Sequence, residues 1–337
     1  MNEYKLSDYI KNFDSYWGYK WRYTLFPEEY TSYLFGIPNT IIFNNIFLHS
    51  KKIDIYHPTY YIKDLNNFKN KHQYASVVLT VHDMIHELYP DHFRDSKSII
   101  NAKQLSVNSA DSIICVSENT KKDLIRLYDV PDDKITVIYH SNSLSKFDTN
   151  LDRTELERTY SITRPFLLYV GDRKAFYKNF STLFEAYKTS LSDHFDLVCF
   201  GGGKFHSGES RMIEEIQSPG KVIHLAGSDY LLASLYKNAF CFVYPSLYEG
   251  FGIPPLEAMG MGCPVIASNT SSIPEVVGNA ALLFDPYSKK SLIDAVEALE
   301  SEELRRKLII SGFEQEKKFS WEKTVVETYK VYNRLVS

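Results

Sequence analysis

Glycine is almost absent from the first half of this sequence. Only Gly18 and Gly36 occur before residue 171, and the other 13 of the 15 glycines lie at or after this position. Glycine lets a backbone turn sharply and lets its N–H groups come close to a ligand. We therefore expect any phosphate contact made through the backbone to lie mainly in the second half of the chain.

Cysteine is scarce as well. The four cysteines lie far apart, mostly in apolar runs, and none belongs to a C-x-x-C pair: Cys115, Cys199, Cys241 and Cys263. This spacing argues against a disulfide framework and against a zinc site built on such pairs. It predicts buried free thiols in a reducing compartment.

Long apolar runs are missing too. The first residues contain no apolar segment typical of a secretory signal. No run approaches the roughly 18 apolar residues that an ordinary spanning helix needs. With a net charge of −4, the chain is also an unsuitable nucleic-acid partner. We expect a cytoplasmic protein of two domains, because 337 residues exceed one usual core.

Several catalytic signatures do not occur. There is no G-x-S-x-G elbow and no G-x-x-x-x-G-K-[ST] loop, which argues against a serine hydrolase of that class and a P-loop enzyme. No D-x-D triplet occurs either, so the usual carboxylate pair for a metal-bound nucleotide sugar is missing. The sequence thus predicts no metal site.

Short apolar runs alternate with helical periods along most of the chain. The expected strands are 53–56, 77–81, 112–116, 135–139, 166–170, 195–200, 221–224, 240–244, 264–267 and 281–284. This alternation predicts an α/β protein with two doubly wound parallel sheets. The polar residues 145–164 are interpreted as the linker between domains 1–150 and 151–320, and a last helix begins near Trp321.

The most informative stretch follows the strand at 240–244. A loop containing Gly250 and Gly252 leads into a helix that Pro254 and Pro255 open. Free N–H groups at such a helix start attract anions. Glu249 and Glu257 would repel a phosphate, so we expect them to accept hydrogen bonds from sugar hydroxyls. Alternatively, one is a solvated loop residue and the other complements the helix dipole.

Other polar residues also follow strand ends. Arg173, Lys174 and Lys178 come after the strand that ends at Gly171, where they could hold a diphosphate or be solvated. The triple glycine at 201–203 allows a tight turn near a ligand.

Two histidines and two serines complete this group. His82 could act as an acid or base, contact a ligand or be structural, and His140 is placed similarly. Ser271 and Ser272 could bind phosphate or cap the next helix. All these groups should face one crevice, because ligands bind at the carboxyl ends of parallel strands.

Together these motifs resemble the retaining glycosyltransferases of family 4. The most specific part is the E-x7-E signature from Glu249 to Glu257, and the similarity runs from about Val77 to the end of the chain. Further matches are Thr-Val-His-Asp at 80–83, Ser-Glu-Asn-Thr at 117–120, Tyr-Val-Gly…Tyr-Lys-Asn at 169–179 and Ile-Pro-Glu-Val-Val at 273–277. The combination is most similar to mannosyl- and rhamnosyltransferases of bacterial polysaccharide synthesis.

The resemblance implies the GT-B fold, in which two Rossmann-like domains face a crevice. Residues 1–150 would form the acceptor domain and 151–320 the donor domain, while the helix at 321–337 would cross back to the first domain. Residues 1–35 lack the apolar strand and glycine-rich loop with which relatives usually open. We therefore expect either that the first domain is shortened or that another segment replaces this loop.

The resemblance also implies roles for the candidate residues. Glu249 would contact the donor sugar and Glu257 the nucleotide ribose. Arg173 and Lys178 would stabilise the leaving diphosphate, with His82 near the transferred sugar. The remaining donor-binding candidates are Gly171, Gly202, Phe251, Gly252 and Ile253.

The implied reaction transfers a hexose with retention and without a metal or cofactor. The donor would be a GDP, UDP or dTDP sugar, and the acceptor a glycan or a lipid-linked glycan. We expect no nucleic-acid partner, and peripheral contact with the inner membrane surface. Two alternatives stay open: a degenerate subunit that binds nucleotide or glycan as a scaffold, and a nucleotide-sugar epimerase.

Overall fold

The computed structural model describes residues 54–58, 60–61, 76–147, 149 and 151–336. The chain divides into two compact units. One consists of residues 1–54 and 67–75, of which only Asp54 is described, and the other contains everything discussed below. The expectation of a shortened start, which rests on residues 1–35, lies outside the described residues.

The first sheet has four parallel strands in the order β1-β2-β3-β4. Its strands are β1 (Ile55–Tyr56), β2 (Ser76–Val81), β3 (Ser112–Cys115) and β4 (Ile135–Val137). The helical segments of this half are α4 (Ile85–Leu88), η2 (Pro90–His92), α5 (Ser96–Ser109), η3 (Asp132–Lys134) and α6 (Glu118–Tyr128). The central strands β2 and β3 consist mostly of apolar residues. This is expected because helices cover a parallel sheet and bury the side chains of its central strands.

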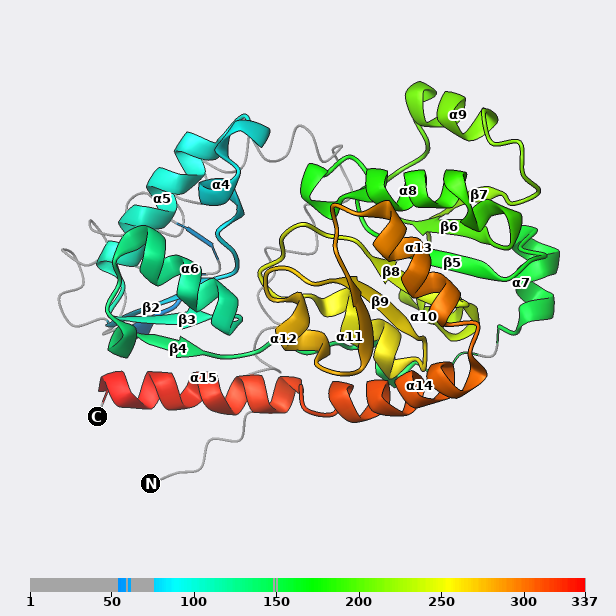
Figure 1. Ribbon diagram of the computed structural model, residues 1–337. Helices are drawn as coiled ribbons and strands as arrows, with labels where there is room; N and C mark the ends of the chain where they lie inside the picture. Colours follow the sequence, from blue (N-terminus) through cyan, green and yellow to red (C-terminus); the bar gives the residue numbers. More distant parts are fainter. Residues whose placement is uncertain (1–53, 59, 62–75, 148, 150, 337) are drawn as a thin grey trace, which may run out of the picture. The chain divides into compact units, whose positions relative to one another are not determined.

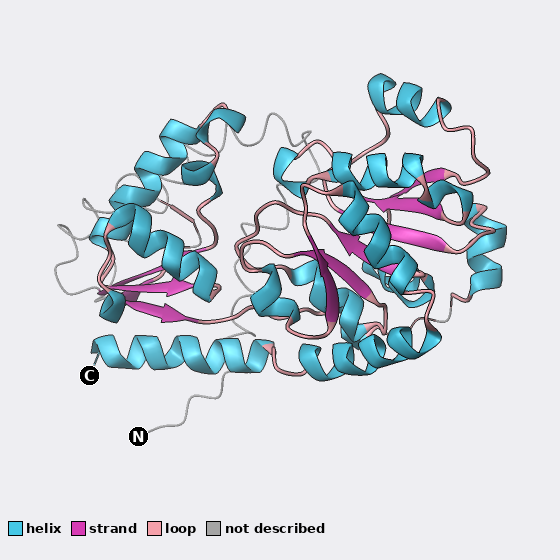
Figure 2. Ribbon diagram, in the orientation of Figure 1, coloured by secondary structure: helices cyan, strands magenta, loops and turns pink. Residues whose placement is uncertain are grey.

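The second sheet has six parallel strands in the order β10-β9-β8-β5-β6-β7. They are β5 (Phe166–Val170), β6 (Asp196–Phe200), β7 (Val222–Leu225), β8 (Cys241–Tyr244), β9 (Val265–Ser268) and β10 (Ala281–Phe284). The strand order reverses between β5 and β8, which are direct neighbours. Figure 2 shows helices on both sides of this sheet.

Each face of the second sheet has its own buried core. Leu168, Phe242 and Val265 pack with residues of α10 (Asp229–Asn238), α11 (Ile253–Gly260) and α12 (Ile273–Val277). Leu167, Val243 and Ile266 point the other way, toward α8 (Phe180–Thr189) and α13 (Lys289–Ala298). This alternation follows from the two-residue period of a strand. The remaining segments are η5 (Phe176–Lys178), η6 (Leu191–Asp193), α9 (Ser207–Glu214) and α14 (Glu302–Glu316).

The last helix, α15 (Trp321–Val336), leaves the second sheet and packs on the first (Figure 1). Val331 lies in one buried cluster with Val78, Ile114 and Ile138. The hydroxyl of Tyr332 lies 2.6 Å from Nδ1 of His57. The two sheets and this helix confirm the predicted fold class.

The predicted strands agree with the structure to within about two residues at their ends. The segment 145–164, interpreted as a linker, is more ordered than expected. It overlaps η4 (Leu144–Lys146) and contains α7 (Arg153–Tyr160). Leu156 of α7 is buried in the core of the second sheet. One apolar residue per helical turn is too weak a signal in a charged stretch, and the domain boundaries themselves stay a prediction.

The four cysteines are buried and unpaired, as expected. No helix among the described residues is long and apolar enough to cross a membrane. The same residues contain no group of three or more His, Cys, Asp or Glu side chains that could hold a metal ion.

Candidate active site

Two loops that carry predicted site residues meet where the strand order of the second sheet reverses. Gly171 follows β5, and the loop 245–252 follows β8; we call the latter the motif loop. Leu167 pairs with Cys241 and Leu168 with Phe242, so the two loops leave adjacent strands. Such a reversal opens a crevice beyond the strand ends, where ligands of α/β sheets bind.

Lys178 and Glu249 form an ion pair at this point. Nζ of Lys178 lies 2.7 Å from Oε1 of Glu249, and the two side chains are 18% and 13% exposed. The rings of Tyr177 and Tyr244 lie 5.4 and 5.5 Å from the ammonium nitrogen. The pair therefore places a cation beside a carboxylate that can accept hydrogen bonds from hydroxyl groups. Both groups are partly desolvated.

Hydrogen bonds between the turn that carries Lys178 and the motif loop hold this ion pair in place. Asn179 ends η5 in the left-handed region, with φ of 51°. Its side-chain amide donates to the carbonyl oxygens of Pro245 and Pro286, at 3.0 and 2.9 Å. The N–H of Leu247 donates to the carbonyl of Tyr177 at 2.7 Å. The turn that carries Lys178 is thus hydrogen-bonded directly to the motif loop.

Ser271 and Ser272 support the motif loop from the end of β9. The hydroxyl of Ser271 accepts from the N–H of Glu249 at 3.0 Å. The hydroxyl of Ser272 lies 2.8 and 2.6 Å from the carbonyl oxygens of Glu249 and Phe251. The sequence predicts either phosphate binding or helix capping for these serines, whereas in the structure their hydroxyls hold the motif loop.

The motif loop ends at the start of α11. Gly252 has φ of 126°, a region that glycine tolerates better than other residues, and α11 has proline in its first turn. The N–H groups of Phe251, Gly252 and Ile253 donate to no other described residue. Free N–H groups at a helix start suit the anion site that the sequence predicts, and the role of these residues stays a prediction.

Glu257 lies one turn inside α11. Its Oε2 accepts a hydrogen bond from the hydroxyl of Tyr236 at 3.2 Å. Burial raises the pKa of the Glu257 carboxyl, although the hydrogen bond from Tyr236 works in the opposite direction. A half-buried carboxyl with spare acceptor sites could accept from ribose hydroxyls, and this role of Glu257 stays a prediction.

Arg173 is held by the triple-glycine turn. Nη1 and Nη2 donate to the carbonyls of Gly201 and Gly203 at 2.9 and 2.8 Å, while Nε contacts Glu209 at 2.8 Å. The residue is only 7% exposed. In this structure Arg173 therefore stabilises the turn, and its predicted contact with a diphosphate would require some of these bonds to break. Lys174, next to it, is exposed.

Gly171 and Gly202 complete this turn. Gly202 has φ of 68°, and a Cβ there would lie 2.7 Å from the carbonyl oxygen of Gly171. The two glycines thus allow the ends of β5 and β6 to approach closely. Whether their backbones also contact a donor stays a prediction.

His82 follows β2 of the first sheet. Its ring stacks on His140, with centroids 5.9 Å apart, and His140 also contacts the ring of Phe251 at 5.6 Å. Burial lowers the pKa of His82, and it lowers that of His140 to about 4. Both rings are therefore neutral at pH 7, so His82 can donate or accept a hydrogen bond near the motif loop.

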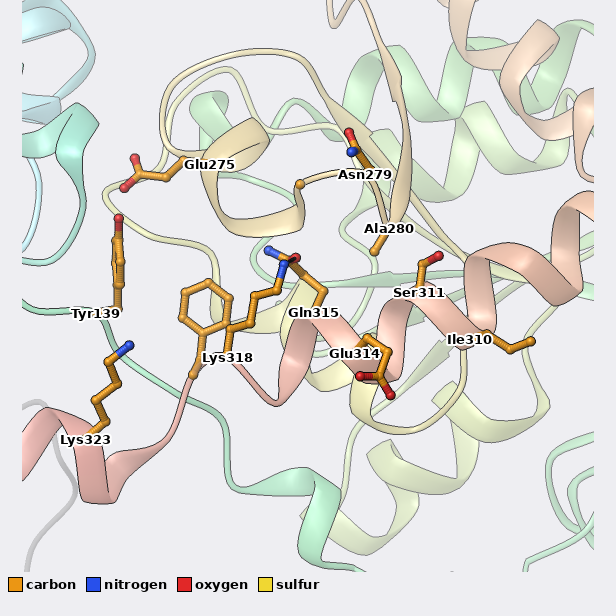
Figure 3. Close-up of a pocket in the computed structure, with 12 residues that line it drawn as sticks. Tyr139, Glu275, Asn279, Ala280, Ile310, Ser311, Glu314, Gln315, Lys318 and Lys323 are labelled. Atoms are coloured by element: carbon orange, nitrogen blue, oxygen red, sulfur yellow. Dashed lines mark hydrogen bonds between the residues drawn. The ribbon is translucent and has the colours of Figure 1, made fainter.

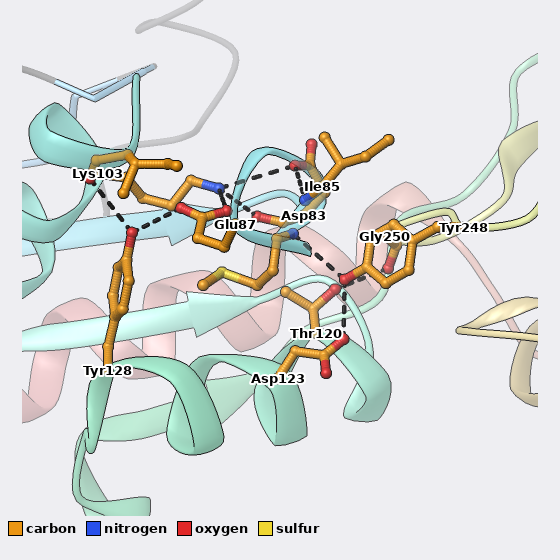
Figure 4. A network of polar contacts seen from close by, with 11 residues as sticks. Asp83, Ile85, Glu87, Lys103, Thr120, Asp123, Tyr128, Tyr248 and Gly250 are labelled. Carbon is orange, nitrogen blue, oxygen red and sulfur yellow. Dashed lines mark hydrogen bonds and ion pairs between the residues drawn. The ribbon is translucent and has the colours of Figure 1, made fainter. Parts of the chain in front are cut away.

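A polar network joins the first sheet to the motif loop (Figure 4). The hydroxyl of Tyr248 accepts from the N–H of Met84 at 3.3 Å and donates to Asp123 at 3.0 Å. Ser117 and Thr120 donate to the carbonyl of Gly250 at 2.6 and 3.0 Å. These two hydroxyls belong to the Ser-Glu-Asn-Thr motif at 117–120, whose sequence alone does not predict this contact with the loop.

A pocket of about 630 Å³ lies elsewhere, between Tyr139, the turn after α12, α14 and the start of α15. Figure 3 shows Glu275, Gln315 and Lys318 around it. None of the predicted site residues lines this pocket. The candidate site is therefore defined by the two strand-end loops.

Comparison with known proteins identifies the family of this chain. Residues 152–315 match the family model "Glycosyl transferases group 1", and residues 20–142 match "Glycosyltransferase Family 4". The second match begins well before the first described residue.

Two similar proteins are mannosyltransferases. The O-antigen chain mannosyltransferase B of Escherichia coli is 31% identical over 293 residues, covering 82% of this chain and 74% of that protein. The O-antigen chain mannosyltransferase RfbU of Salmonella typhimurium is 32% identical over 224 residues, covering 66% of this chain and 60% of that protein.

A solved structure supports the fold independently. Sucrose-phosphate synthase from Thermosynechococcus elongatus superposes with a TM-score of 0.72 at 20% identity, covering 92% of this chain and 80% of the other. At that identity the likeness concerns the fold alone. From the family matches, the relatives and this fold, the chain belongs to the group 1, family 4 glycosyltransferases and is a hexosyltransferase with the GT-B fold.

Proposed function

We propose that this enzyme transfers a mannose- or rhamnose-like hexose from a nucleoside-diphosphate sugar to a glycan or lipid-linked acceptor of a bacterial surface polysaccharide. The ion pair of Lys178 and Glu249 is the observation that carries this proposal. The O-antigen mannosyltransferases similar to the chain support a mannose-like sugar.

The proposed reaction breaks the bond between the anomeric carbon and the diphosphate oxygen. The acceptor hydroxyl forms the new bond on the same face of the sugar, and its proton passes to the leaving diphosphate. Negative charge grows on that diphosphate, and the Lys178 ammonium, now paired with Glu249, would stabilise it. Glu249 would accept hydrogen bonds from sugar hydroxyls and orient the ring.

The other candidates would bind the rest of the donor. Glu257 would accept from the ribose, and the free N–H groups at the start of α11 would meet the sugar and the diphosphate. His82, neutral at pH 7, would contact the sugar from the first sheet. Because Lys178 supplies positive charge, we expect turnover to persist after chelation of divalent metals.

The test compares two site variants with a matched pair. Lys178→Ala and Glu249→Ala should each lower kcat by about 100-fold or more, as removal of an electrostatic group does in other enzymes. Lys330 and Glu327 form an exposed pair of the same 2.7 Å length on α15. Lys330→Ala and Glu327→Ala should keep full activity, and full activity in all four variants would exclude the proposed site.

The nucleotide is identified by thermal stability with GDP, UDP or dTDP. A ligand at about 100 times its Kd stabilises the folded state by about 2.7 kcal/mol. Stabilisation by one of them, lost in Glu257→Ala, would support the proposed ribose contact. Binding without sugar transfer to any acceptor would favour the scaffold alternative, and a changed donor sugar without acceptor would indicate an epimerase.

The lipid-linked form of the acceptor would bring the enzyme to the inner membrane surface. Flotation with vesicles of anionic and neutral phospholipids tests this part of the proposal. Absence of the protein from both vesicle fractions would limit the proposal to a water-soluble glycan acceptor.

A further inference from the structure

A cluster of aromatic rings joins the segment after β2 to the loops around Lys178 and Glu249. We call it the aromatic clasp. Its members from the first half are Tyr89, His92 and Phe93, and those from the second half are Phe176, Tyr177 and Tyr248. The proposed reaction assigns no role to these rings.

Phe176 is the centre of the clasp. Its ring stacks on His92 with centroids 3.7 Å apart and planes 14° apart. Tyr89 and Phe93 meet it edge-on, at 5.1 and 5.7 Å, and Tyr177 does so at 5.9 Å. Phe176 is half-buried and belongs to neither core of the second sheet. Its position is therefore determined mainly by other rings of the clasp.

The clasp is connected to the ion pair through a very short stretch of backbone. Phe176 and Lys178 occupy the same three-residue turn, η5, and the N–H of Asn179 closes that turn onto the carbonyl of Phe176 at 3.0 Å. On the other side, Tyr248 directly precedes Glu249, and its ring lies 6.3 Å from that of Tyr89. Movement of either ring would thus shift one member of the pair.

From these contacts we infer that Phe176 is a positioning residue: packed in the aromatic clasp, it holds the turn that aims Lys178 at the diphosphate. The inference rests on the proposed role of Lys178. A lysine stem has four rotatable bonds, so a rigid turn at its base limits the space that its ammonium explores. An error of about 1 Å in such a group can lower the rate about 100-fold.

The inference is tested by binding, which needs no known acceptor. Isothermal titration calorimetry gives the affinities for GDP and GMP, UDP and UMP, and dTDP and dTMP. The ratio of diphosphate to monophosphate affinity reports the contact of Lys178 with the second phosphate. Phe176→Ala should lower this ratio about tenfold with little change in the monophosphate affinity, whereas Phe176→Tyr should retain it.

A double mutant separates positioning from general damage. If Phe176 acts through Lys178, Phe176→Ala should change the ratio little in a Lys178→Ala background, because coupled residues are not additive. Tyr329→Ala is the control, since Tyr329 is 61% exposed on α15. An unchanged ratio in Phe176→Ala, or an equal loss in both backgrounds, would overturn the inference.

Two further outcomes concern the proposed function. A Lys178→Ala variant that keeps the diphosphate preference would refute the role of Lys178 itself. No binding of any nucleotide by the unaltered enzyme would refute the donor site, and the inference with it.

Discussion

Gly250 of the motif loop lies directly against the carbonyl group of His82. A Cβ at Gly250 would overlap that carbonyl oxygen and would lie 3.0 Å from Cβ of Asp83. The carbonyl of Gly250 in turn accepts from the hydroxyls of Ser117 and Thr120. The end of β2, the start of α6 and the motif loop therefore meet at a position where only glycine fits.

Gly250→Ala is expected to separate these segments while leaving both sheets folded. The added methyl group must displace the backbone of His82 or of the motif loop. Because Glu249 immediately precedes Gly250, this displacement would move Glu249, and we expect kcat to fall by about 100-fold. Gly227→Ala is the control, since a Cβ there meets mainly the flexible end of Leu231. Normal turnover by Gly250→Ala would show that this close approach is not needed for activity.

Arg173 and Lys178 should differ in their effect on stability. Arg173 is 7% exposed and makes three polar contacts through its planar guanidinium, which a lysine cannot reproduce. Arg173→Lys should lower the free energy of unfolding by about 2–4 kcal/mol, the range for breaking buried charged contacts. Lys178→Met should lower it less, by about 1.5 kcal/mol, because it removes one charged contact where Arg173→Lys disturbs three.

Urea denaturation of both variants measures this difference. If Arg173→Lys unfolds at the same urea concentration as the unaltered enzyme yet loses turnover, Arg173 leaves the glycine turn and acts on the diphosphate, as the family resemblance implies. If stability falls, the main role of Arg173 is to hold the glycine turn through the contacts seen here.

Glu275 should stabilise the start of α6. Its carboxylate accepts from the N–H groups of Glu118 and Asn119 at 2.8 and 3.2 Å, while the side chain of Ser117 accepts from Thr120. A helix start leaves such donors without partners, so an acidic side chain there is favourable. Glu275→Ala should lower the free energy of unfolding by about 1–2 kcal/mol. Glu275→Gln should have a smaller effect, and the exposed Glu314→Ala almost none.

The meeting of Lys178 and Glu249 could be predicted because both follow neighbouring parallel strands. The carboxyl ends of such strands share one edge, so residues 71 positions apart come together. Most of the short strands were equally clear, since β2, β5, β6, β8 and β9 are mostly buried runs of aliphatic and aromatic residues. The strand β7, half-buried along its whole length, gave a weaker signal.

Contacts between loops could not be predicted in this way. Glu209 pairs with Arg173 from the first turn of α9, a short helix that contributes no buried residue to a core. The stacking of His92 on Phe176 depends on where two loops meet in space. Periodicity reports which face of an element is buried, but it contains no information about such meetings.

Glu257 provides a prediction about pH. Burial raises the pKa of this carboxyl in the folded state above its value in the unfolded chain. Between those two pKa values the folded state holds a proton that the unfolded chain has lost, so stability falls as the pH rises through this range. Below the pKa of the unfolded chain both states are protonated, and the penalty vanishes.

Glu257→Gln mimics the protonated form and can still accept the hydrogen bond from Tyr236. Its thermal unfolding temperature should therefore exceed that of the unaltered enzyme at pH 8 and should approach it at pH 4. Exposed Glu297→Gln on α13 should show no such dependence.

Greater stability of Glu257→Gln at pH 8 together with weaker nucleotide binding would mean that the enzyme keeps an unfavourably buried carboxylate for the ribose. If Glu257→Gln and the unaltered enzyme were equally stable at pH 8 and also at pH 4, the burial argument would be wrong. The charged carboxylate would then be adequately solvated in the folded enzyme.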